Sequence, residues 1–169
     1  MAKRTFLLAA IAAALLLLGF WITVPERSGS DLVAPGAIHW HPRLTIYVNG
    51  EQVPIPENIG IGAQYAGTRG YDPQMGMAAM HTHEDLPLIH LEFMRGPVYA
   101  EDITLGRFFQ IWNKDMRSFG ENMRPSDERG STEASRMNVR MTVNGAPTTE
   151  YEGYVMKDGD AIELRYGSE

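Results

Sequence analysis

This chain of 169 residues contains no cysteine and carries a formal net charge of −6. The length indicates one domain plus an appendage, and the lack of cysteine excludes disulfides, thiolate metal ligands, iron–sulfur clusters and a lipoprotein anchor. Two of the 15 basic residues, Lys3 and Arg4, belong to the appendage, so the rest of the chain has a charge of −8, which argues against nucleic acid or anionic lipid as a partner and favours cations.

The appendage is an apolar segment, residues 5–24, that contains no charged residue. It is long enough to cross a hydrocarbon core of roughly 30 Å as a helix. Bulky residues stand where a signal peptidase prefers small ones, Trp21 suits the membrane interface, and Lys3-Arg4 favour a cytoplasmic N-terminus. We therefore expect residues 1–24 to be a single-pass anchor in a cytoplasmic-type membrane, with the C-terminal part extracytoplasmic (periplasmic). A cleaved signal peptide is the alternative.

Residues 25–37 are polar and contain Gly and Pro, which predicts a short tether. Residues 38–169 then form the predicted extracytoplasmic β-rich domain. It begins with alternating apolar and polar residues from 43 to 48, the pattern of a strand with one buried face. Asn49-Gly50 and a second alternating run follow, and this is the strongest short signal for a β-hairpin.

His39 and His41 precede this hairpin as an H-x-H pair. Side chains two residues apart on a strand leave the same face. By parity, both histidines lie opposite the aliphatic Leu44 and Ile46. We therefore expect them on the polar face of the strand and away from the core.

Three more histidines, His81, His83 and His90, lie in the middle of the chain. The residues around His90 alternate between apolar and polar, as in a strand with one buried face. Residues 84–87 predict a hairpin loop. In the register that pairs position 83 with 88, His81 lies opposite His90 and the three imidazoles share one face.

A Gly-rich loop, residues 56–74, separates the two histidine pairs, and Met75, Met77 and Met80 follow it. Thioether sulfur is a soft ligand that favours Cu(I). Methionine also fills gaps in ordinary apolar cores. Met80, directly before His81, is therefore a lower-ranked candidate ligand.

Residues 104–113 (TLGRFFQIWN) predict the helix of the domain. Thr104 is a candidate N-cap, and the apolar residues behind it form the stripe of a helix that lies on a sheet. Residues 118–135 are charged and contain Gly and Pro, which predicts an exposed loop. That loop is either a partner-binding insertion or a solvated linker.

The C-terminal third is β again, with alternating residues 139–143 before Asn144-Gly145 and a last strand that places Ile162, Leu164 and Tyr166 on one face. Strands, one helix and further strands that end in D-G-D-A-I-E-L-R-Y-G resemble a β-grasp arrangement, and the ending is similar to the last strand of ubiquitin-like sulfur-carrier domains. The predicted fold is α+β: an N-terminal transmembrane helix, then a mostly antiparallel, β-grasp-like sheet with one packed helix.

A wider resemblance covers His39 to Phe109. H-x-H with a V-N-G hairpin, then H-T-H-E/D, then I-H-x-E, then T-L-G-x-F-F occur in this order. This order resembles an uncharacterised family of membrane-anchored extracytoplasmic proteins of bacteria and archaea. The resemblance implies that the histidines matter throughout the family, and it implies no particular chemistry.

Imidazoles that converge from two hairpins suit a borderline transition metal, because neutral nitrogen ligands bind copper and zinc. We expect copper first, because of the methionines, and zinc second; the alternative is a solvated polar face without a metal. The candidate metal ligands, in order of preference, are His81, His83, His90, His39 and His41, with Glu92 and Met80 of lower rank.

Three functions are compatible with these residues. The first is a membrane-anchored, extracytoplasmic, histidine-rich domain that binds copper or zinc for delivery or storage. The second is an accessory structural subunit of a larger respiratory or photosynthetic membrane complex. The third is a zinc-dependent hydrolase or hydratase with Glu84 or Glu92 as base; it has the least support, because H-E-x-x-H and G-x-S-x-G are missing.

Overall fold

The computed structural model describes residues 31–85, 87–119 and 139–167. The predicted anchor, the first part of the predicted tether and most of the predicted loop 118–135 lie outside these residues. Within the described part, no helix has the length and apolar character needed to cross a membrane. The end of the predicted tether is folded instead, because β1 (Leu32–Ala34) pairs with β7 (Val98–Tyr99).

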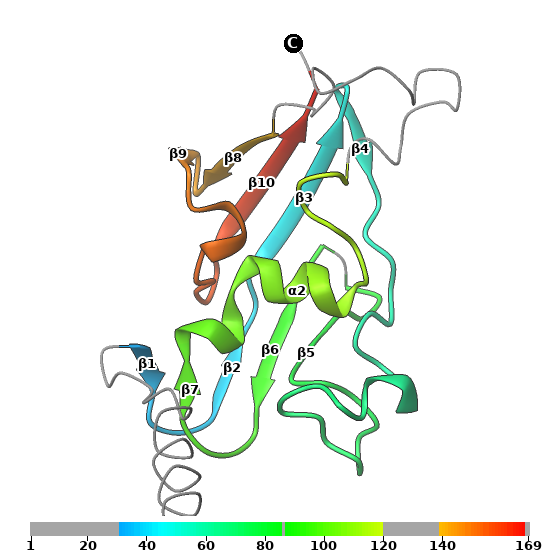
Figure 1. Cartoon of the computed structure of the whole chain (residues 1–169), viewed down its shortest axis with the longest axis vertical. Helices are drawn as coiled ribbons and strands as arrows, with labels where there is room; N and C mark the ends of the chain where they lie inside the picture. Colours follow the sequence, from blue (N-terminus) through cyan, green and yellow to red (C-terminus); the bar gives the residue numbers. More distant parts are fainter. Residues whose placement is uncertain (1–30, 86, 120–138, 168–169) are drawn as a thin grey trace, which may run out of the picture. The chain divides into compact units, whose positions relative to one another are not determined.

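The largest sheet has five strands in the order β4-β3-β10-β8-β9. Its two longest strands, β3 and β10, lie side by side and run parallel, whereas all other neighbours in this sheet are antiparallel (Figure 1). The five strands are β3 (Arg43–Val48), β4 (Glu51–Val53), β8 (Val139–Val143), β9 (Ala146–Thr148) and β10 (Ala161–Tyr166).

Both predicted Asn-Gly hairpins are confirmed. Asn49 and Gly50 have φ angles of 52° and 85°, and Asn144 and Gly145 have φ angles of 52° and 80°. Two successive residues with positive φ form the turn whose twist matches that of paired antiparallel strands. The turns connect β3 to β4 and β8 to β9.

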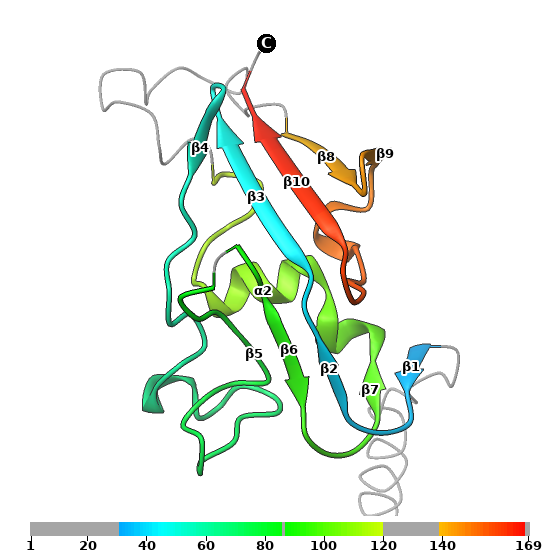
Figure 2. The same ribbon diagram turned by 180° about the vertical axis from the view of Figure 1, so that it is seen from behind.

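The predicted helix is also confirmed as α2 (Leu105–Ile111). The Thr104 side chain accepts a hydrogen bond of 3.2 Å from the backbone N–H of Arg107, which satisfies one of the free donors at the helix start. Phe108 and Phe109 are buried in the core. In Figure 1 α2 lies in front of the start of β3, and Figure 2 shows the strand in front of the helix, so α2 covers one face of the sheet.

A smaller sheet carries the histidines. It has the antiparallel order β2-β6-β5, with β2 (Ile38–Trp40), β6 (His90–Phe93) and β5 (Met80–His81). The described domain is therefore mixed α+β, with mostly antiparallel sheets and one α-helix among the described residues, as the sequence predicts.

The histidine hairpin has the predicted pair but is shorter than predicted. His81 lies opposite His90, and pairing stops there. The predicted pair of His83 with Leu88 does not form, because Leu88 forms an antiparallel bridge with Arg43 instead. The backbone of Thr82 bonds to Asn58 and Ile59 of the preceding loop. Competition from these two neighbouring segments ends the ladder.

Gly60 allows this loop to lie against β5. It has φ +78°, and a Cβ at this position would overlap the carbonyl oxygen of Met80 and press on His81. Gly76 has a similar φ of +69° but open space around it. We expect Gly60→Ala to lower the free energy of unfolding by about 3 kcal/mol, and Gly76→Ala by about 1 kcal/mol, since only the first adds overlap to the cost of left-handed backbone.

Urea denaturation of the two variants and the parent chain measures this difference. Gly76→Ala is the matched control because it carries the backbone cost without the overlap. Equal losses for the two variants would show that the loop can move away from His81 without cost.

Candidate metal centre

All five histidines of the chain meet in one continuous cluster, as expected if the two H-x-H pairs abut. His90 is at its middle, with ring-centroid distances of 4.8 Å to His41, 4.9 Å to His83 and 5.3 Å to His81. Within the pairs, the rings of His39 and His41 are 4.6 Å apart, and those of His81 and His83 are 4.8 Å apart.

Strand pairing produces this convergence. In β6, His90 lies opposite His81 of β5, and Glu92 lies opposite His39 of β2. The segment before β6 also lies antiparallel to the segment after β2, because the backbone N–H of Ile89 donates to the carbonyl of Pro42 over 2.8 Å. That pairing brings His41 next to His90.

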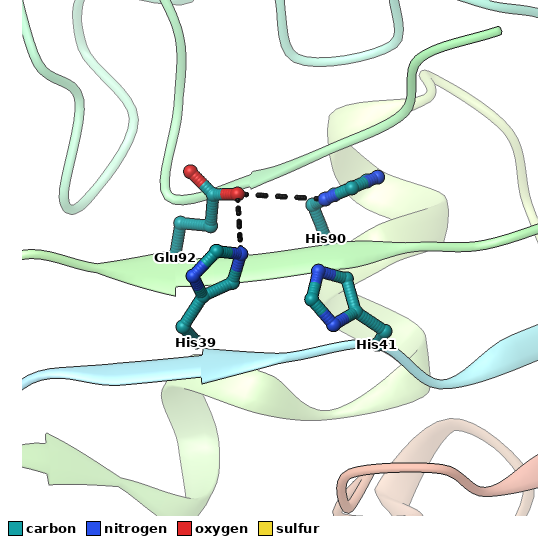
Figure 3. Close-up of side chains that lie close together, drawn as sticks. All are labelled: His39, His41, His90 and Glu92. Atoms are coloured by element: carbon teal, nitrogen blue, oxygen red, sulfur yellow. Dashed lines mark ion pairs between the residues drawn. The ribbon is translucent and has the colours of Figure 1, made fainter. Parts of the chain in front are cut away.

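The first group of possible ligands consists of His39, His41, His90 and Glu92. Figure 3 shows the three imidazoles and the carboxylate gathered over strands β2 and β6. One oxygen of Glu92 lies 2.9 Å from Nε2 of His39 and 3.4 Å from Nδ1 of His90. One nitrogen or oxygen atom from each of the four residues lies within 4.8 Å of all the others. Glu92 is therefore placed both to bind an ion and to orient imidazoles.

The second group consists of His81, His83 and His90, whose ligand nitrogens also lie within 4.8 Å of one another. His81 is fully buried, His90 nearly so, and His83 is half-buried. The sequence predicts a polar outer face for these histidines. The structure differs because His81 and His90 are buried. The loop before β5 lies against His81, as the hydrogen bonds of Thr82 and the close approach of Gly60 show.

His81 is held in one tautomer. Its Nδ1 lies 2.9 Å from the carbonyl oxygen of Ala78. A carbonyl can only accept, so Nδ1 carries the hydrogen and Nε2 of the neutral ring has the free lone pair. Nε2 is buried and has no hydrogen-bond partner among the described residues. This pattern is typical of a metal-binding histidine, whose other nitrogen donates to a carbonyl.

The pKa of His81 is lowered from 6.5 to about 4. Burial is the main cause, and the hydrogen bond to Ala78 and the charge of Glu92 act in the opposite direction. His83 and His90 lower the pKa further. His81 is therefore neutral at pH 7, and a neutral imidazole is the form that binds a metal ion.

His90 has a carboxylate near each ring nitrogen. Its Nε2 lies 3.1 Å from both carboxylate oxygens of Asp85. Its buried Nδ1 lies at ion-pair distance from Glu92 but without the alignment of a hydrogen bond. The hydrogen bond to His90 is the main cause of a lowered pKa for Asp85.

Asp85 is a site residue that the sequence analysis misses. It lies in the expected hairpin loop, where an acidic residue is ordinary and by itself indicates only an exposed turn. The available signal is its place two residues after an H-x-H pair, because carboxylates often orient the histidines of a metal site.

Met80 is not brought together with the histidines. It precedes His81 on β5, so its side chain leaves the opposite face, and it is buried in the apolar core next to Leu91. Met75 is half-exposed, and Met77 bridges to Ile61 and Asp72. Met80, the candidate sulfur ligand, is therefore not part of either group.

We expect the metal-free chain to lose stability as the pH falls. Between pH 6.5 and about 4, the unfolded chain binds a proton at His81 that the folded chain does not bind. The free energy of unfolding therefore decreases across this window and this contribution levels off below it. At 1.36 kcal/mol per pKa unit, the loss is roughly 3 kcal/mol.

Urea titrations at several pH values within this window test the expectation. His81→Asn is the control, since its amide can still donate to the Ala78 carbonyl but does not titrate. The free energy of unfolding of this variant should depend less on pH than that of the parent chain. An identical pH dependence of the two chains would assign the effect to other groups.

Comparison of the chain with protein-family models, with curated proteins and with solved structures finds no match. The histidine cluster is thus interpreted from its own distances, burial and hydrogen bonds.

Proposed function

We propose that this protein is a transition-metal binding protein whose histidine cluster takes up copper in preference to zinc. The observation that carries the proposal is the buried Nε2 of His81, which has a free lone pair and no partner. One ring nitrogen from each of His81, His83 and His90 lies within 4.8 Å of the other two.

The free-energy cost of burying Nε2 of His81 without a partner supports a role for His81 as a metal ligand. A buried polar atom without a hydrogen bond costs about 1–3 kcal/mol. An apolar side chain of similar size at position 81 would avoid that cost, since the surroundings of β5 are packed and covered. A metal ion bonded to Nε2 would remove it, and the ion would also satisfy His83 and His90.

The donor atoms favour copper. Both groups offer imidazole nitrogen, with carboxylate from Glu92, and the chain has no thiolate. Nitrogen sites bind Cu²⁺ more tightly than Zn²⁺ in the general order of divalent ions. The preference for copper therefore comes from the imidazoles, and the methionines no longer support it.

The exposure of the ligands fits a site that exchanges ions with its surroundings. His39 is exposed, His83 is half-buried and His81 is fully buried. An ion can therefore meet exposed imidazole first and buried imidazole last. Delivery or storage of a metal needs such access.

We extend the proposal to the location and the fold class. Residues 5–24 would hold the chain in a cytoplasmic-type membrane, with the metal centre on the periplasmic side. The strand order β4-β3-β10-β8-β9, with its parallel central pair and the helix on one face, supports a β-grasp-like arrangement. The motif order shared with the membrane-anchored extracytoplasmic family supports the same location. The accessory-subunit and hydrolase functions stay predictions.

Titration of the full-length chain with Cu²⁺ tests the function. We expect tight, stoichiometric binding, measured by elemental analysis after removal of excess metal, and a raised unfolding midpoint when metal is present. His81→Asn keeps the hydrogen bond to Ala78 but removes the Nε2 ligand. It should weaken copper binding by about 100-fold or more, since even partners of metal ligands contribute 10–100-fold.

Glu57→Gln is the matched surface control, because Glu57 is an exposed acidic residue in the loop before β5. It should bind copper as the parent chain does. Retention of tight binding in His81→Asn, in a chain with native circular dichroism, would contradict the proposal.

A further inference from the structure

The five histidines are too widely spread to bind one ion together. Metal–nitrogen bonds of about 2.0–2.1 Å place two ligands of one ion at most about 4.2 Å apart. The possible ligand atoms form two groups, in each of which the atoms lie within 4.8 Å of one another, so small side-chain movements would bring each group to this spacing. Among the described residues no such group includes both H-x-H pairs. The two pairs therefore belong to two neighbouring positions.

His90 belongs to both groups. Each of its ring nitrogens has one lone pair when deprotonated, so each can bind one ion. Nδ1 faces Glu92, whose same oxygen contacts His39. When both positions are occupied, Nδ1 binds the ion near Glu92 and His39. Nε2, on the Asp85 side of the ring, is then left for the ion held by His81 and His83.

We propose, on the basis of the metal-binding function above, that the cluster holds two divalent ions bridged by the imidazolate of His90. The inner ion is bound by His81, His83 and Nε2 of His90. The outer ion is bound by His39, His41, Glu92 and Nδ1 of His90. The ring releases its N–H proton to water as the second ion binds.

The charges near His90 favour this arrangement. Asp85 and Glu92 approach the two sides of the ring, and the imidazolate adds a third negative charge. Together they offset most of the charge of two divalent ions. Loss of the proton also frees Asp85 from its hydrogen bond to Nε2, so that its carboxylate can turn to the inner ion.

Copper content and electron paramagnetic resonance of the full-length chain test the bridge. We expect two Cu²⁺ per chain and a low-temperature signal well below the intensity of two isolated ions, because an imidazolate couples two unpaired electrons antiferromagnetically. The double variant His39→Ala/His41→Ala should bind one Cu²⁺ with the full signal of an isolated ion.

The outcomes separate this inference from the function on which it depends. No bound copper would contradict both. One copper per chain, or a second copper that the double variant retains as a surface ion, would overturn the two-ion site and leave metal binding intact. Two coppers with full, uncoupled intensity would overturn the bridge. Circular dichroism of the double variant shows whether its fold is native.

Discussion

The pairing of β6 with a strand on each side is the constraint on which the site depends. β6 places His90 opposite His81 on one side and Glu92 opposite His39 on the other. Because side chains alternate along a strand, a slip of one residue in either pairing would turn half of these groups toward the core. The buried Ile89, Leu91 and Phe93 on the other face oppose such a slip. The apolar core thus fixes the positions of the polar groups.

The loop before β5 is a second constraint on the site. It lies against His81 at Gly60, and the Thr82 hydroxyl fixes the loop by hydrogen bonds to Ile59 and Pro56. His41 is fixed instead to the turn before β10, since its backbone N–H donates to Asp158 over 2.8 Å. The cluster therefore lies where the small sheet, a loop and the turn before β10 meet. All the ligands come from the small sheet or from the residues directly after β2 and β5. Their positions also depend on contacts with that loop and that turn, so the centre forms only when the domain is folded.

Local sequence patterns predict the helix and the strands well. They predict less well which of these elements and loops contact one another. The Asn-Gly pairs, the N-cap Thr104 and the alternation around His90 each depend on neighbouring residues, so they can be read from one segment. The early end of the histidine hairpin depends on competition from Arg43, which is far away in sequence. The close packing of a loop against His81 depends on Gly60, which is also distant in sequence. Neither the contact of Asp85 nor the division into two ligand groups has a local signature.

The two H-x-H pairs show how one spacing gives two environments. On β2, an edge strand, His39 stays exposed and contacts a carboxylate. On β5 the strand ends at His81, so His83 takes its position from the loop, and His81 becomes buried and neutral at pH 7. An ion at the second pair would contact buried imidazole, whereas an ion at the first pair would keep contact with solvent. Ions should therefore exchange faster at the outer position, and a shared His90 would link occupation of the inner position to that of the outer one.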